Sequence, residues 1–376
     1  MDAAAVTLDD LDGRHHEVLA ALRADHPVAW VPALDGWVIT SRTLAVEVMR
    51  DAETFTVDDP RFSTAQVVGP SMLSLDGAEH QRHRAPFADP LRPSDATARY
   101  GERIRAAADE LVGGLAPRGR AELRREVAGP LAVAVSAMVL GIEHIPADHL
   151  LGIYDRIVSA VDGVARGDGV SADGRAAFDE LAAELMGAIT REGSLVADAA
   201  TSLTQGETVS NAAVFLFGGI ETSEGMTANV LHHLLADRHA WREVIDHPAL
   251  ADAAVEESLR LEPAAARVDR YATRDAVLAG ERIGSGDLLI VSLAAANRDP
   301  NVFTEPDRFV LHRGNARSHV TFAHGPHACI GAQLARLQTR AAVQSLARAL
   351  PSIELSSAPR VSGVVFRKPA ALDAIW

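Results

Sequence analysis

One short segment near the C-terminal end limits the architecture more than any other part of the chain. Residues Phe322 to Gly331 read FAHGPHACIG and contain Cys329, the only cysteine among 376 residues. A single cysteine cannot form an internal disulfide or a multi-cysteine metal site. Cys329 is therefore either an inert buried thiol, which is the usual case for a lone cysteine, or a thiol with a special role.

The surroundings of Cys329 favour the special role. Gly325 and Gly331 allow the backbone to turn sharply and to pass close to a flat group. From Ile330 onward apolar residues recur with helical spacing, which places Cys329 at the start of a predicted helix. Free N–H groups and the helix dipole favour a thiolate there. A thiolate held in this way is a soft ligand that can coordinate one metal ion through its sulfur atom.

A second unusual segment lies inside a long helix predicted for residues 207–237. Gly218 and Gly219 precede an acid, Glu221, and a hydroxyl, Thr222. Two glycines in a helix interior cost about 1 kcal/mol each relative to alanine, and they allow a kink. The segment is either a flexible core helix with its polar side chains in solvent, or a groove in which the acid and the hydroxyl move protons.

Two further pairs have helical spacing. Glu257 and Arg260 are three residues apart and share a helix face, where an exposed ion pair worth little is the default interpretation. His80 and Arg84 are four apart and also share a face, and a basic surface patch is the default interpretation there.

Together and in this order, these segments resemble the cytochrome P450 family. The chain matches Phe-x-x-Gly-x-x-x-Cys-x-Gly around Cys329, Glu-x-x-Arg at Glu257, Ala/Gly-Gly-x-Asp/Glu-Thr-Thr/Ser at Gly218 and His-x-x-x-Arg at His80. The resemblance runs from about residue 30 to the C-terminus. It implies a mainly α fold with a small β-rich subdomain, formed as a single cytochrome P450 domain over residues 1–376. That domain would enclose one haem b, with the Cys329 thiolate as the iron ligand.

The resemblance also assigns roles to other residues. Thr222 would hydrogen-bond dioxygen or an ordered water, Glu221 would relay protons, and Glu257 with Arg260 would form a buried structural network with Arg313 as the third partner. Phe322, Gly325 and Gly331 would shape the cysteine loop, and the haem propionates would be bound by four donors: His80, Arg84, Arg270 and His327.

By position in the family pattern, a largely aliphatic set of residues would line the substrate pocket: Val214, Phe217, Gly218, Ala266, Val268 and Val364. Arg267 lies in the same segment. If it points inward it predicts an anionic substrate, and otherwise it faces away or joins the propionate cluster.

The implied activity is the insertion of one oxygen atom from O2 into a small or medium-sized, mostly apolar molecule, by hydroxylation or epoxidation. We expect this to tailor a bacterial natural product. The alternatives are another haem-thiolate reaction, such as peroxygenation, C–C coupling or desaturation, or a haem protein without enzymatic activity. The Glu221–Thr222 pair favours oxygen activation.

Charge and composition limit partners and location. A formal net charge of −15 argues against binding to nucleic acid or to anionic membranes. The N-terminus lacks the features of a signal peptide and no apolar run is long enough to span a membrane, so a cytoplasmic protein is expected.

The chain ends soon after the helix that follows Cys329, so electrons are expected from a separate ferredoxin-type or flavodoxin-type partner. A basic patch near Cys329 could receive that partner, although the same arginines could equally be ordinary solvated helix faces: Arg82, Arg92, Arg336 and Arg340.

Periodicity predicts the remaining elements. Residues 28–31 and 36–40 are predicted to pair as strands, 59–76 to form a loop, and 288–291 and 363–367 to form a strand and a hairpin. Helices are predicted from residue 79, from about 99, and over 127–140, 147–165, 174–191, 207–237 and 239–261.

Overall fold

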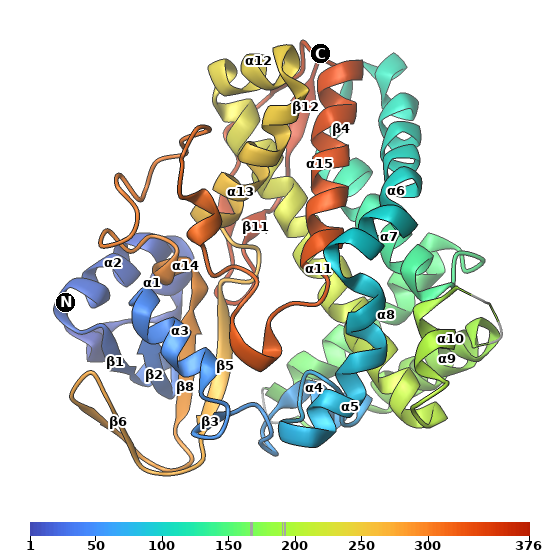
Figure 1. Ribbon diagram of the computed structural model, residues 1–376. Coiled ribbons are helices and arrows are strands. Elements are labelled where there is room, and N and C mark those ends of the chain that lie inside the picture. Colours follow the sequence, from blue (N-terminus) through green and yellow to red (C-terminus); the bar gives the residue numbers. More distant parts are fainter. Residues whose placement is uncertain (166–167, 190, 192) are drawn as a thin grey trace.

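The molecule is mainly helical, with its strands gathered at one side. The structure is a computed structural model that describes residues 1–165, 168–189, 191 and 193–376. Long helices fill one side of the molecule, and most strands lie with the N-terminal helices on the other (Figure 1). This is the mainly α fold with a small β-rich part that the sequence predicts.

A long central helix, α11 (Gln205–Ala236), organises the helical side and is buried along most of its length. A capping box fixes its start, because the Thr204 hydroxyl accepts from the Glu207 N–H while the Glu207 carboxylate accepts from the Thr204 N–H. The helices that pack most extensively against α11 are α7 (Gly129–Leu140), α13 (Ala251–Leu261) and α15 (Ala332–Ala349). A fourth, α6 (Pro93–Leu115), packs against α15.

The main sheet has five strands in the order β1 (Val28–Val31), β2 (Gly36–Ile39), β8 (Leu288–Ser292), β5 (Arg267–Ala272) and β3 (Phe55–Thr56). β1 and β2 form the predicted hairpin, with Val28 opposite Ile39. β5 runs antiparallel to β8, with Val268 opposite Val291. Consecutive residues of β5 therefore face opposite sides of the sheet, which decides which of them can reach the site.

Short strands form the smaller sheets: β4 (Arg120–Glu122) with β12 (Asp373–Ile375) and β9 (Glu354–Leu355), β6 (Ala276–Leu278) with β7 (Glu281–Ile283), and β10 (Val361–Ser362) with β11 (Lys368–Pro369). The hairpin predicted at 363–367 exists, but these residues form its turn and the strands flank them.

Two predicted segments differ from the structure. Residues 59–76, predicted as a loop, contain the helix α4 (Ser63–Val68), which buries Thr64, Val67 and Val68. The single helix predicted for 239–261 is divided into α12 (Arg238–Asp246) and α13, because Pro248 begins a short 3-10 turn between them.

Two helices, α8 (Ala147–Ala165) and α9 (Ala172–Ala188), pack on each other and on α4. Residue 190, in the predicted helix 174–191, lies outside the described residues, and α9 ends at Ala188. The remaining helices are α1 (Leu8–Gly13), α2 (His15–Asp25), α3 (Arg42–Arg50), α5 (Gly77–Ala88), α10 (Leu195–Ala199) and α14 (Leu293–Ala296). Within the described ranges, no helix combines the length and apolarity that crossing a membrane requires.

Candidate functional site

A cavity of about 270 Å³ lies where α11 meets the cysteine loop. Gly218 and Thr222 line it from the middle of α11, and Phe322 and Cys329 line it from the loop. The two segments that the sequence singles out are far apart along the chain, and the fold brings them to one space.

Cys329 is positioned by its backbone and faces the cavity. Its N–H donates to the Phe322 carbonyl at 2.8 Å. The residue has exposed surface, and because it lines the cavity this surface is turned to the interior space rather than to bulk solvent. Burial raises the pKa of the thiol, against the lowering effect of the Gly331 N–H and of Arg84 and Arg336 nearby.

The expectation that the start of a helix favours a Cys329 thiolate is therefore outweighed by burial in the free protein. The N–H donors that the sequence predicts are present, and they act in the expected direction. A bound metal ion deprotonates a coordinating thiol outright, so the site itself does not need a preformed thiolate.

The cysteine loop is pressed against α3 at Gly325. This glycine has a φ of +73°, and a Cβ at this position would lie 2.3 Å from the Met49 carbonyl oxygen. Only glycine fits both the backbone conformation and the close approach. Gly331 is less crowded, since a Cβ there would have the Cys329 Sγ as its nearest neighbour at 3.9 Å.

Two polar side chains in the middle of α11, Thr222 and Glu221, point in different directions. The Thr222 hydroxyl donates to the Gly218 carbonyl at 2.5 Å and lines the cavity. Glu221 is instead directed to Lys368, with Oε1 2.8 Å from Nζ. A Cβ on Gly218 would meet no atom within 4 Å, which shows that α11 borders open space at this point.

The four predicted propionate donors lie around the cavity or next to its rim. Arg84 and His327 line the cavity, and Arg84 Nη2 donates to the Ala328 carbonyl. His80 lies against His327, with ring centroids 4.2 Å apart. Arg270 is buried on β5, two residues after Val268 and on the same face of the strand.

Asp76 belongs to the same group, although no motif in the sequence singled it out. Its carboxylate is 2.7 Å from His327 Nε2 and accepts from the Thr56 hydroxyl and the Val57 N–H. Burial alone would raise the pKa of Asp76, but these hydrogen bonds, His327 first, lower it to about 2. Burial lowers the pKa of His80 to about 4, with the nearby His327 adding to the effect.

These residues fit a flat, doubly anionic group with a metal ion at its centre. Cys329 supplies one soft ligand atom inside the cavity. Arg270 is buried, and among the described residues its guanidinium makes one hydrogen bond, from Nη1 to the Asp269 carbonyl. An arginine carries five N–H donors, so most remain for an anion. The His80 Nε2 is also buried without a hydrogen-bond partner among the described residues.

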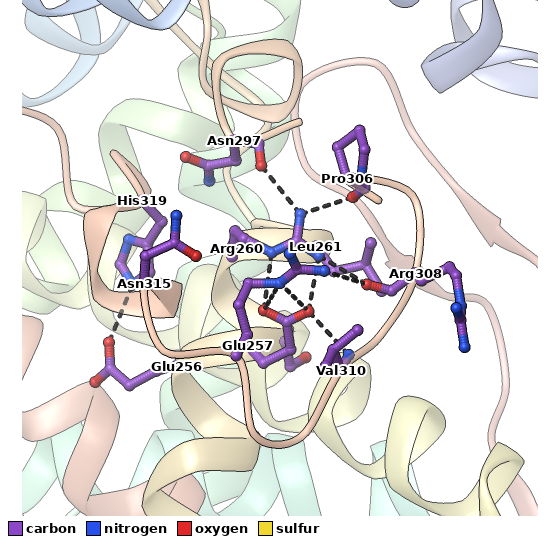
Figure 2. A network of polar contacts seen from close by, with 12 residues as sticks. Glu256, Glu257, Arg260, Leu261, Asn297, Pro306, Arg308, Val310, Asn315 and His319 are labelled. Atoms are coloured by element: carbon purple, nitrogen blue, oxygen red, sulfur yellow. Dashed lines mark hydrogen bonds and ion pairs between the residues drawn. The ribbon is translucent and has the colours of Figure 1, made fainter. Parts of the chain in front are cut away.

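A buried ion-pair network joins α13 to the irregular chain that precedes the cysteine loop, and Figure 2 shows its Glu257 and Arg260 side chains. Glu257 and Arg260 are both fully buried, and Arg260 donates two hydrogen bonds of 2.8 Å to the Glu257 carboxylate. Arg260 also donates to the carbonyls of Asn297, Pro306 and Arg308, at 3.1, 2.7 and 2.9 Å. The network thus holds the irregular chain that leads to the cysteine loop.

Arg313 completes this network as expected, with Nε 2.9 Å from Glu257 Oε1. His312 points elsewhere and contacts Glu243 of α12 at 2.8 Å. The neighbouring Glu256 (Figure 2) forms a second buried pair, in which hydrogen bonds from His319 and then Arg336 lower its pKa to about 2 although burial alone would raise it.

The predicted substrate wall is only partly assembled at the cavity. Val214, Gly218 and Val268 line it. Phe217 packs instead against the rings of Tyr154 and Phe366, at centroid distances of 6.4 and 6.1 Å.

The other three predicted wall residues need correction. Ala266 and Val364 pack into the apolar cluster beside α2 and β2, away from the cavity. Arg267 points to the face of β5 opposite to Val268 and lies 3.6 Å from Asp269, so it joins neither the cavity wall nor the propionate group. The reversal of face from one strand residue to the next explains Arg267, because the sequence alone does not give the register. Ala266 precedes β5, and its N–H donates to the Val365 carbonyl in the turn 363–367.

The predicted basic patch near Cys329 is largely neutralised. Each of its four arginines forms an ion pair with a carboxylate: Arg82 with Glu79 and Glu207, Arg92 with Asp89, Arg336 with Glu256, and Arg340 with Asp252. These arginines are better described as paired helix surfaces than as a positive patch.

Comparison with known proteins agrees with this geometry. The sequence profile of the family described as Cytochrome P450 matches residues 185–350. The chain is 31% identical to the 20-oxo-5-O-mycaminosyltylactone 23-monooxygenase of Streptomyces fradiae, over 96% of this chain and 88% of that enzyme. It is 29% identical to the nocardicin C N-oxygenase of Nocardia uniformis subsp. tsuyamanensis, over 96% of this chain and 95% of that enzyme. Cytochrome P450 CYP109Q5 from Chondromyces apiculatus superposes with a TM-score of 0.87 at 26% identity, covering 100% of this chain and 97% of that structure.

Fold, site and relatives define an oxidoreductase with a haem iron cofactor. The chain belongs to the cytochrome P450 family and is a monooxygenase. The family, the fold and the enzyme class predicted from the sequence are confirmed.

Proposed function

We propose that this monooxygenase binds haem b through the Cys329 thiolate and inserts one oxygen atom into a small or medium-sized, mostly apolar molecule. The observation that carries the proposal is the shared cavity. The only thiol of the chain and the Gly218–Thr222 turn of α11 line the same space, with the Arg84 and His327 side chains beside them.

The chain's own residues would hold the cofactor as follows. Cys329 Sγ would bind the iron and supply electron density to it. Arg84, Arg270 and His327, with His80 packed on His327, would meet the two carboxylates with hydrogen-bond donors. When bound, the haem supplies the dioxygen chemistry and the oxygen transfer.

Proton supply falls to Thr222 and Glu221. The Thr222 hydroxyl lies in the cavity lining and donates its single proton to the Gly218 carbonyl, which fixes the side-chain rotamer. Its oxygen can accept a hydrogen bond from a water molecule in the cavity, and a hydrogen bond to dioxygen would require that proton to turn away from Gly218. Glu221, one residue earlier, would accept protons from solvent and pass them on through water.

The cavity wall supports a mostly apolar substrate. Val214 and Val268 present aliphatic side chains, and Met72, Leu73 and Leu293 extend the same apolar lining. Because Arg267 points away, the wall offers no arginine for a substrate carboxylate at this position. Hydroxylation or epoxidation of an apolar natural-product skeleton suits such a wall, and the relative named as a 20-oxo-5-O-mycaminosyltylactone 23-monooxygenase supports a tailoring role.

Electrons would come from a separate ferredoxin-type or flavodoxin-type protein that docks over the cysteine loop. The arginines near this loop are each paired with a carboxylate, so such a partner would be recognised mainly by shape and by exchange of ion pairs, with modest long-range attraction.

The ferrous–CO absorption spectrum of the purified protein tests the proposal. We expect the strongly red-shifted Soret band of thiolate ligation, and its loss in Cys329→Ser with the fold retained by circular dichroism. A histidine-type band in the unaltered protein would overturn the assignment of Cys329.

A further inference from the structure

The chain contains one lysine, and its side chain contacts Glu221, the acid of the proposed proton relay. Lysine and arginine together number 36, and Lys368 is the only lysine among them. Its Nζ lies 2.8 Å from Glu221 Oε1 and 2.7 Å from Glu224 Oε2, and its side chain is 16% exposed. No sequence motif points to Lys368, and its being the only lysine is the one signal that singles it out.

The geometry explains why a lysine suits this position. Glu221 and Glu224 are three residues apart on α11, so their carboxylates lie on one face of the helix. A compact ammonium group with three rotatable donors can be shared between two carboxylates. The planar guanidinium fork of an arginine is better matched to one.

The two carboxylates are not equivalent. Glu224 also lies 3.5 Å from Arg124 Nη1, so it contacts two cations. Among the described residues, Glu221 has only the Lys368 contact. Glu221 can therefore leave Lys368 while Glu224 still balances the ammonium charge. In the described part of the chain Glu221 contacts one cation where Glu224 contacts two, and Glu221 is the acid next to Thr222 in the sequence.

Lys368 belongs to the hairpin that also touches the cavity wall. It begins β11, and residues 363–367 form the turn that precedes it. In this turn Phe366 pairs with Ala265, which lines the cavity, and its ring lies 6.1 Å from that of Phe217. Phe366 and Lys368 are two residues apart, so Arg367, whose N–H donates to the Ala264 carbonyl, is the connection through which a displacement of the turn would reach Lys368.

We infer that Lys368 is a positioning residue that holds Glu221 away from the cavity until an occupant of the cavity displaces the turn 363–367. The contact between Lys368 and Glu221 then couples occupancy of the cavity to proton supply. This inference rests on the proposed role of Glu221, and it adds a residue and a control to that role.

A direct test uses the fact that Lys368 is the only lysine. Reductive methylation with 13C-formaldehyde labels the Lys368 amine and the N-terminal amine and keeps their charge. Lys368→Arg assigns the two signals, because it removes only the first. Spectra are recorded on the reduced, low-spin holoprotein with two iron ligands, 4-phenylimidazole and the matched smaller imidazole.

We expect Glu221→Gln to shift the Lys368 methyl signal in the protein with imidazole. We also expect 4-phenylimidazole, whose phenyl ring fills the cavity, to shift the signal of the unaltered protein in the same direction. The inference is overturned if the signal is the same with both ligands, or if Glu221→Gln leaves it unchanged.

A second measurement follows proton supply with a matched control. Oxygen consumption without substrate is measured with a plant ferredoxin and its reductase as electron source. Lys368→Met releases Glu221 and should raise consumption about fivefold, the factor that corresponds to an ion pair worth about 1 kcal/mol. Arg124→Met removes a cation whose one carboxylate contact among the described residues is Glu224, and it should change consumption less than twofold.

The outcomes separate this inference from the proposed function. Equal rates in Lys368→Met and the unaltered protein, with Glu221→Gln defective in proton supply, would refute the role of Lys368 and leave that of Glu221. Normal proton supply in Glu221→Gln would refute the relay itself, even with the contact seen by NMR. Circular dichroism and haem content of Lys368→Met equal to those of the unaltered protein guard against an effect of misfolding.

Discussion

Arg260→Met should destabilise the protein strongly, because it breaks an ion pair that water does not reach. Arg260 and Glu257 both have side chains with 0% exposure. The substitution removes two hydrogen bonds to the carboxylate and three to backbone carbonyls of the chain that leads to the cysteine loop. Methionine fills much of the volume but supplies no donor.

The size of the expected loss in stability depends on how well the Glu257 charge is compensated after Arg260 is removed. Removing one partner of a buried pair costs about 3–5 kcal/mol, mostly because the other charge is left without compensation. Here Arg313 still contacts Glu257 at 2.9 Å, which places the expected loss near the lower end, at about 3–4 kcal/mol. With an unfolding entropy of about 2.1 cal/mol/K per residue, a chain of this length should lose about 4–5 °C in Tm.

Arg308→Met provides a matched control. Arg308 pairs with Glu305 at the same spacing of three residues, but the two side chains are 68% and 56% exposed. An exposed pair contributes less than about 1 kcal/mol, so Tm should fall by about 1 °C or less. Urea unfolding and calorimetry of both variants measure the difference. Equal destabilisation of the two variants would refute the reasoning that burial makes the Arg260 pair decisive.

Three further outcomes are expected. Because the pKa of Glu256 is about 2 in the fold, below the ordinary value near 4.5, its stabilising effect is complete above about pH 5 and is lost as the pH falls toward 2. Glu256→Gln should therefore flatten the dependence of the unfolding free energy on pH in that window, as urea unfolding at several pH values will show. Gly325→Ala, which forces a Cβ against the Met49 carbonyl, should abolish most haem incorporation by absorbance. Gly280→Ala has a φ of +92° but no atom within 4 Å, and should cost only about 1–2 kcal/mol of stability. Thr222→Ala should keep NAD(P)H consumption but divert it from product to hydrogen peroxide, and unchanged coupling would contradict the assigned role.

The cysteine loop and the middle of α11 could be predicted because their signals are local. Gly325 and Cys329 lie within one short segment, and the fixed spacing carries the geometry with it. The glycines of α11 are conspicuous for a similar reason, since a helix interior rarely accepts two of them. Each of these predictions needs only the conformation of a few consecutive residues, and the structure brings the two segments to one cavity.

The substrate wall could not be predicted in the same way, because it depends on strand register. Arg267 and Val268 are consecutive, and an extended strand sends consecutive residues to opposite faces. Only the pairing of β5 with β8 fixes which face is which. The helix α4 was missed for a related reason, since six residues show too little periodicity to be distinguished from a loop.

Charge pairing is the other property that the sequence hides. Arg82 meets Glu207 from another helix, at a separation of 125 residues, so counting arginines suggests a positive patch where the fold makes a neutral surface. The same limit applies to Lys368, whose partner acids lie on α11 while it lies on a hairpin near the end of the chain.

Cation identity matters most where a charge must be both held and released. An arginine locked on two carboxylate oxygens, as Arg260 is on Glu257, makes a contact that persists, which suits a network that supports the cysteine loop. The ammonium of Lys368 makes single, rotatable contacts with two acids and can lose one while keeping the other. The fold thus places its rigid ion pairs behind the cofactor site and its one adaptable cation beside the acid that would have to move.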